Sequence, residues 1–233
     1  GNCVINNYDA SESRTSDKLV LKGVKKSDVE ISRNGLNIII SDVVGNEVIT
    51  IKDAYNTSYG NGIFYLENVE FDDGKFGKND LLKATSVRRG SDANDVIDGY
   101  GAVYNYSEDE TIYAGAGDDT VHGNNGDDVI YGESGNDTLY GGNGDDVIVG
   151  GIGEDYLAGD AGADIYIHSR GDGNCVINNY DASESRTSDK LVLNGVKKSE
   201  VEISRNGYDM IIRDTVSKET VTVKNAYNTS YGN

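Results

Sequence analysis

Aspartate recurs at every ninth residue through the middle of this chain, each time just before a short apolar run. Six unbroken nonapeptides fill residues 114–167: AGAGDDTVH, GNNGDDVIY, GESGNDTLY, GGNGDDVIV, GGIGEDYLA and GDAGADIYI. Glycines at the first, second and fourth positions permit positive φ and leave carbonyl oxygens unshielded, so one tight turn can direct several oxygens at a single point. The sixth-position aspartate adds a hard anionic oxygen to that turn. Such a set of oxygens predicts a cation site.

The three residues after each aspartate favour a strand, with a large apolar residue in the middle: Val121, Ile130, Leu139, Ile148, Leu157 and Tyr166. A turn followed directly by a short strand, repeated without a break, must coil. We expect two nonapeptides per circuit, so that each residue stacks on its equivalent two repeats later. Stacked carboxylates such as Asp128 and Asp146 repel each other unless a cation lies between them. Flexible sites made only of oxygens suit Ca²⁺ better than Mg²⁺ or Zn²⁺.

The charge of the chain agrees with a cation ligand. Asp and Glu total 40 against 21 Lys and Arg, a formal charge of −19, and residues 114–167 hold ten Asp, two Glu and no basic residue. About four to six Ca²⁺ ions would offset most of that block's charge, and without them the block is too acidic and too poor in apolar residues to fold. The same charge argues against nucleic acid or an anionic membrane as partner. No apolar run approaches the ~20 residues that span a bilayer.

The nonapeptides resemble the repeats-in-toxin (RTX), or haemolysin-type, calcium-binding repeats, GGxGxDxUx with U a large apolar residue. The resemblance implies a parallel β-roll in which one turn and the turn two repeats later hold each ion through carbonyl oxygens and both sixth-position aspartates. The four implied sites are Gly115, Gly117 and Asp119 with Gly132, Ser134 and Asp137; Asn124, Gly126 and Asp128 with Gly141, Asn143 and Asp146; Glu133, Gly135 and Asp137 with Gly150, Ile152 and Asp155; and Gly142, Gly144 and Asp146 with Gly159, Ala161 and Asp164. Glu110, Ala93 and Cys175 depart from the pattern at the ends, so no site is assigned there.

A longer repeat encloses the nonapeptides. Residues 1–61 match residues 173–233 with an offset of 172 and differ at 13 of 61 positions. Alternating apolar residues predict strands over 17–24, 28–35, 36–44, 47–55 and 63–71. Asn34-Gly35 and Asn206-Gly207 predict type I′ hairpins, and residues 78–85 predict one or two helical turns capped by Asn79.

These flanking segments resemble the β-rich domain that often follows RTX blocks. The predicted fold is all-β: a parallel β-roll of calcium-binding nonapeptide repeats (86–172) flanked by β-rich domains (1–85 and 173–233). The chain begins and ends within the repeat pattern, so we expect it to be a window from a longer tandem array.

Cys3 and Cys175 are two copies of one position, for which we expect a buried free thiol, with a disulfide between copies or chains as the alternative. The coil should present two outer faces. One face carries Val129, Tyr131, Val147, Val149, Ile165 and Ile167, and the other carries Thr120, His122, Thr138, Tyr140, Tyr156 and Ala158. The first face is too apolar for water, so we expect it to pack against a flanking domain or another copy.

No residue pattern predicts catalysis. The paired carboxylates could serve acid–base chemistry, but their recurrence in every repeat favours structural ligands, and the sequence has no HExxH or GxSxG motif. We therefore expect a non-enzymatic, calcium-dependent structural segment of a large secreted or cell-surface bacterial protein, such as an adhesin, surface-layer component or fibre. Its partners would be calcium and adjacent copies, including homo-assembly, and the resemblance implies type I secretion. The alternatives are a calcium-binding secretion module of an exported toxin, protease or lipase, and a carbohydrate-binding module that uses exposed tyrosines.

Overall fold

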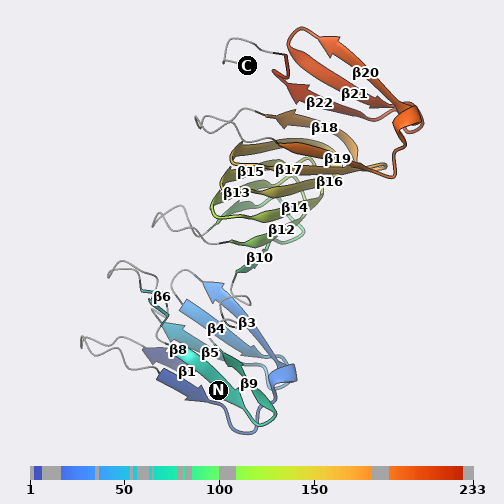
Figure 1. The fold of residues 1–233 in the computed structure, drawn as a ribbon. Coiled ribbons are helices and arrows are strands. Elements are labelled where there is room, and N and C mark those ends of the chain that lie inside the picture. Colours follow the sequence, from blue (N-terminus) through green and yellow to red (C-terminus); the bar gives the residue numbers. More distant parts are fainter. Residues whose placement is uncertain are drawn as a thin grey trace. The chain divides into compact units, whose positions relative to one another are not determined.

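The computed structural model describes residues 3–6, 17–34, 37–52, 55–56, 63–64, 66–77, 81, 86–99, 109–179 and 189–227. The chain forms two compact units, Gly1–Val87 and Arg88–Asn233 (Figure 1). Strands dominate both units, so the predicted all-β class is confirmed. Within the described ranges no helix is long and apolar enough to cross a membrane. The helical turns expected over 78–85 lie outside the described residues except for Leu81.

The first unit contains nine strands among its described residues. They are β1 (Cys3–Asn6), β2 (Asp17–Val20), β3 (Val29–Asn34), β4 (Asn37–Asp42), β5 (Glu47–Lys52), β6 (Tyr55–Asn56), β7 (Ile63–Phe64), β8 (Leu66–Phe71) and β9 (Gly74–Gly77), with a 3-10 turn at Lys26–Asp28. One sheet has the order β1-β5-β4-β3, another β2-β8-β9, and β6 pairs with β7. The core is Ile38, Ile40, Ile51, Val69, Phe71 and Leu81. The sequence pattern missed β1 and β9.

The predicted hairpins form, but with a different turn in the second copy. β3 pairs antiparallel with β4 from Asn34 opposite Asn37, and residues 35–36 of this turn lie outside the described residues. In the second copy Asn206 pairs with Asp209, so the two turn residues are Gly207 and Tyr208. Only Gly207 has positive φ, at 63°. A positive φ at the first turn position alone is the pattern of a type II′ turn, so the predicted type I′ turn at Asn206-Gly207 is wrong.

The second unit is built on a parallel β-roll. Its strands are β10 (Val87–Arg89), β11 (Val96–Asp98), β12 (Thr111–Ala116), β13 (Thr120–Asn125), β14 (Val129–Ser134), β15 (Thr138–Asn143), β16 (Val147–Ala161) and β17 (Ile165–Ser169). Alternate strands stack in parallel: β12, β14, β16 and β17 on one side, and β11, β13, β15 and β16 on the other. Residues two repeats apart are partners, as in Val129 with Val147. The predicted circuit of two nonapeptides is therefore confirmed.

The middle residue of each strand triplet points inward. Val121, Ile130, Leu139 and Ile148 are fully buried, and Leu157 and Tyr166 are at most 2% exposed. On the outer face, Val147 and Ile165 are half-buried within this unit, so packing of that face against another domain stays a prediction. Ala158 lies in register with Tyr140 and Asn178 on the neighbouring strands, at its predicted outer position, but is only 1% exposed.

The roll continues into the second copy of the flanking sequence. This part comprises β18 (Gly173–Asn178), β19 (Lys190–Asn194), β20 (Val201–Asn206), β21 (Asp209–Asp214) and β22 (Thr220–Lys224), with a 3-10 turn at Lys198–Glu200. β18 pairs in parallel with β16, and β19 with β17. β22, β21 and β20 extend the β18 side of the sheet (Figure 1). Both sheets of the roll therefore run on into this segment.

Candidate metal centre

The sixth-position aspartates form two buried ladders. Asp128 N–H donates to Asp146 Oδ1 at 2.7 Å, and Asp146 N–H donates to Asp164 Oδ1 at 2.9 Å. In the other column, Asp119 N–H donates to Asp137 Oδ1 at 2.9 Å, and Asp137 N–H to Asp155 Oδ1 at 3.0 Å. All six side chains are at most 5% exposed. Each ladder stacks carboxylates from alternate repeats, as the sequence predicted.

The second oxygen of most ladder carboxylates has no hydrogen-bond donor. The buried Oδ2 atoms of Asp119, Asp128, Asp137, Asp146 and Asp164 lack a partner. A buried anionic oxygen without a partner is costly, because it has lost its hydration with nothing in return. When ionised, these five oxygens need a cation, and no described side chain of the protein supplies one beside them.

Glycine leaves room beside the orphaned oxygens of Asp128, Asp137, Asp146 and Asp164. At Gly132, a Cβ would lie 2.3 Å from Asp137 Oδ2 and 2.3 Å from the carbonyl oxygen of Gly150. At Gly123, the same point is 2.5 Å from Asp128 Oδ2 and 2.5 Å from the Gly141 oxygen. A carboxylate oxygen and a carbonyl oxygen from the turn two repeats later thus converge where a side chain is missing. Hard oxygen donors of this kind fit Ca²⁺.

The glycines of the repeat serve two different purposes. The second and fourth positions have positive φ, as at Gly142 (116°) and Gly144 (134°). At the second position Asn124 and Glu133 also adopt positive φ, at 80° and 72°. The first-position glycines do not adopt positive φ, although glycine permits it there. They are required for the space beside the aspartate instead.

Burial raises the pKa values of Asp128, Asp137, Asp146, Asp155 and Asp164. Loss of solvation is the largest cause, the accepted N–H bond opposes it, and neighbouring carboxylates add to it. The pKa of Asp146 rises to about 8 and that of Asp137 to about 7. The pKa values of Asp128, Asp155 and Asp164 rise to about 6. Without a cation Asp137 and Asp146 therefore resist ionisation near neutral pH.

The structure brings together part of each predicted ligand set. Asp128 Oδ2 and the Gly141 oxygen converge, as do the equivalent atoms of Asp137 with Gly150, and of Asp146 with Gly159. The predicted third-position carbonyl oxygens also accept hydrogen bonds from fourth-position N–H groups of the turn two repeats earlier: Ser134 from Gly117, Asn143 from Gly126, Ile152 from Gly135 and Ala161 from Gly144.

The earlier-turn carbonyl oxygens lie against the next coil. Those of Gly117, Gly126, Gly135 and Gly144 approach the fourth-position glycine of the turn two repeats on, and those of Asn124 and Glu133 approach the equivalent second-position glycines. Nowhere in the described ranges do three or more His, Cys, Asp or Glu side chains gather as a metal site. A site in this roll must therefore draw most of its ligands from the backbone.

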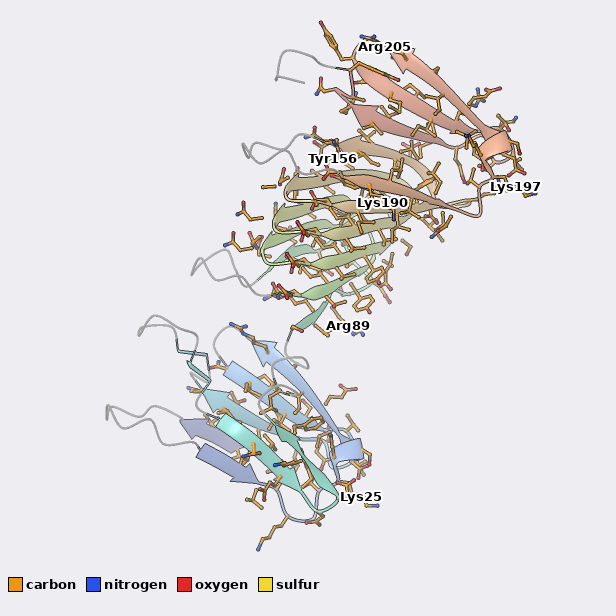
Figure 2. All side chains as sticks on the ribbon, viewed as in Figure 1. Lys25, Arg89, Tyr156, Lys190, Lys197 and Arg205 are labelled. Atoms are coloured by element: carbon orange, nitrogen blue, oxygen red, sulfur yellow. The ribbon has the colours of Figure 1, made fainter. Side chains whose placement is uncertain are left out.

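Both ladders change character at their ends. At the β10 end, where Figure 2 labels Arg89, the Nε of neighbouring Arg88 lies 3.4 Å from Oε1 of buried Glu110, so the protein supplies its own cation there. Asp95 is half-buried, and its Oδ2 accepts bonds from the Ser91 N–H (2.6 Å) and hydroxyl (2.8 Å). At the other end, Cys175 pairs with Asp155, and burial raises the pKa of its thiol to about 12. The side chains at both ends of the ladders therefore differ from those of the central repeats.

Two features escaped the sequence analysis. Asp189 continues a ladder, since its Oδ1 accepts the Asp164 N–H at 2.9 Å, although the spacing of these two aspartates is longer than two repeats. The sequence Asp189-Lys190-Leu191-Val192, an aspartate before a strand triplet, was the available signal. A second, exposed ladder joins fifth-position side chains, as when Asp145 Oδ1 accepts the Ala163 N–H at 2.8 Å.

A comparison with protein families supports the interpretation of the nonapeptides as calcium-binding repeats. The family model described as RTX calcium-binding nonapeptide repeat (4 copies) matches residues 104–139, 131–166 and 140–174. A search of curated proteins finds no match. Among solved structures, the extracellular lipase LipA from Serratia marcescens is 16% identical, with a TM-score of 0.38 over 96% of this chain and 32% of the lipase chain. The chain thus spans about a third of that lipase, and a likeness at this TM-score carries no argument. The roll is therefore a block of RTX calcium-binding nonapeptide repeats.

Proposed function

We propose that this chain is a calcium-dependent structural segment of a large secreted or cell-surface bacterial protein, such as an adhesin, surface-layer component or fibre. The observation that carries the proposal is the row of buried aspartates whose Oδ2 atoms lack a donor. RTX repeats are typical of secreted proteins, and extracellular calcium at ~10⁻³ M suits weak sites of this kind. The chain would stay unfolded in this region inside the cell and become rigid outside, after type I secretion.

The predicted ligand sets pair turns two repeats apart, and Asp119, Asp128, Asp137, Asp146, Asp155 and Asp164 would supply the charged oxygens. Bound calcium would supply the positive charge that lets the stacked carboxylates stay ionised while buried. The first-position glycines keep open the space beside the Oδ2 atoms of Asp128, Asp137, Asp146, Asp155 and Asp164. The positive-φ glycines of the later turn leave room for carbonyl oxygens of the earlier turn. About four to six ions would compensate the block of charge.

Two copies of one sequence, at 1–61 and 173–233, support a tandem array, with flanking domains at 1–85 and 173–233 around the roll at 86–172. In such an array adjacent units would be each other's partners. The role is mechanical and not catalytic, since the ladder carboxylates are held by backbone N–H groups at regular spacing and face the interior of the roll.

Circular dichroism of the full chain during a calcium titration tests this proposal. We expect a cooperative gain of β signal that EDTA reverses and that the same concentration of Mg²⁺ does not produce, because Mg²⁺ demands near-octahedral sites and retains water. Equilibrium dialysis should count about four to six ions per chain. A β signal of the same size in EDTA would refute calcium-dependent folding.

A further inference from the structure

The same four residues, CVIN, occur in two different surroundings. As β1 they pair in parallel with β5, with Cys3 opposite Ile49, and as part of β18 they pair with β22, with Cys175 opposite Val221. The two registers are identical when the copies of the flanking sequence are aligned. β18 also pairs along its other side with β16 of the roll, whereas β1 is the edge strand of its sheet. Among the described strands of the first copy, none pairs with the edge of β1 that corresponds to the edge of β18 joined to the roll.

β2 and its counterpart β19 are a second pair of equivalent strands with different neighbours. In the second copy the Lys190 N–H donates to the Asp164 carbonyl on the roll side of β19. In the first copy the Leu21 N–H donates to the carbonyl oxygen of Glu70, which lies in β8. N–H groups an odd number of positions apart point to opposite edges of a strand. The N–H of Lys18, which is equivalent to Lys190, therefore points away from β8. No described strand pairs with this edge of β2, which corresponds to the roll side of β19.

Side chains on these edges are exposed only in the first copy. Cys3 is exposed, contrary to the expected buried thiol, while Cys175 is 4% exposed. The reason is that β16 covers Cys175 and no described strand takes that place beside β1. Val4 is 61% exposed, but its counterpart Val176 is half-buried. Exposed apolar edge strands invite pairing.

The charged residues beside these edges also differ in their partners between the two copies. Arg170, in the turn after β17, donates from Nε to Asp214 Oδ2 at 2.5 Å and from Nη2 to Glu200 Oε2 at 2.7 Å. These bonds join the last turn of the roll to the flanking segment. The counterparts of Asp214 and Glu200 in the first unit are Asp42 and Asp28, both half-buried acids. The first unit thus presents the acidic pair that receives an arginine in the second.

We propose that the β1 edge, the edge of β2 that faces away from β8 and the Asp28–Asp42 pair form a docking surface for the last coil of a nonapeptide β-roll. The occupant has the sequence found here over 153–173, with its arginine in the final turn. The last coil of the roll in a second copy of this chain cannot bind here, because β18 and β19 of that copy already pair with it. The fitting partner is a roll joined ahead of residue 1, as residues 86–172 are joined ahead of residue 173. This inference rests on the proposed tandem function.

Thiol labelling of an extended chain tests the proposal. A copy of residues 86–172 is placed before Gly1 of the full chain, and a thiol reagent is added in calcium. Cys175→Ser versions of both chains isolate the signal of Cys3. We expect Cys3 to label readily in the original chain and at least about tenfold more slowly in the extended chain, since a buried thiol reacts only through local opening. EDTA should restore its reactivity.

A matched variant carries Arg170→Glu in the added roll only, where it places like charges beside Asp28 and Asp42. Labelling of Cys3 should then become faster than in the unmodified extended chain. Equal labelling of Cys3 in the original and extended chains, while Cys175 in the corresponding Cys3→Ser chains stays protected in calcium, would overturn the docking surface alone. Rapid labelling of both cysteines in calcium would overturn the calcium-dependent roll together with it.

Discussion

The roll and the first unit are held together by different means. The first unit has a compact apolar core that includes Ile38, Ile40 and Leu81, and no acidic side chain is buried among its described residues. The roll buries one large apolar residue from the middle of each strand triplet, and it also buries an aspartate in every repeat. An apolar core stabilises through burial alone, whereas stacked carboxylates need a counter-charge. We therefore propose that one chain combines a unit that folds without metal with a roll that folds only when metal is bound.

Core truncation should separate the two regions most strongly. Leu139→Ala in the roll and Ile40→Ala in the first unit both remove a side chain that is at most 2% exposed, and each should cost about 2–5 kcal/mol of unfolding free energy. Leu139→Ala should raise the calcium midpoint, because ion binding must offset the lost free energy. Ile40→Ala should leave that midpoint unchanged and lower the melting temperature measured in EDTA. Equal shifts of the calcium midpoint would break the distinction.

The next largest effect concerns two adjacent aspartates. Asp146 is buried with an orphaned Oδ2, whereas Asp145 is exposed and its Oδ1 accepts the Ala163 N–H. Asparagine keeps an acceptor oxygen at both positions and removes only the charge. Asp146→Asn should raise the calcium midpoint about tenfold, equivalent to about 1.4 kcal/mol, and Asp145→Asn less than about twofold. Calorimetric titration of both variants checks this, and similar shifts for the two would contradict the assignment of ligands.

A smaller effect is expected from pH without calcium. Because the pKa values of Asp137 and Asp146 rise to about 7 and 8 in the folded roll, against about 4 for an unfolded aspartate, the folded roll binds more protons. Its stability must therefore fall as pH rises through that window and recover on acidification. In EDTA, far-ultraviolet dichroism should show more β signal near pH 5 than near pH 8. A signal that decreases on acidification over this range would contradict the pKa shifts.

Periodic sequence predicts the roll far better than the flanking units. The nine-residue repeat predicts the stacking of alternate repeats and the inward position of residues such as Leu139, because both follow from local geometry. It does not predict the Oδ1 to N–H bonds between coils, which depend on how closely the turns approach. The parallel pairing of β1 with β5 joins segments far apart in the sequence, which no local pattern encodes. Identical sequences at Cys3 and Cys175 cannot predict different exposures, since neighbouring strands decide them.

Hydrogen exchange of the full chain, followed peptide by peptide with and without calcium, tests the central claim most directly. Amides of residues 109–179 should be protected in calcium and exchange freely in EDTA, while amides of β4 and β5 stay protected in both conditions. That result would show that buried carboxylates make one region of the chain conditional on metal. Protection of residues 109–179 that persists in EDTA would contradict it.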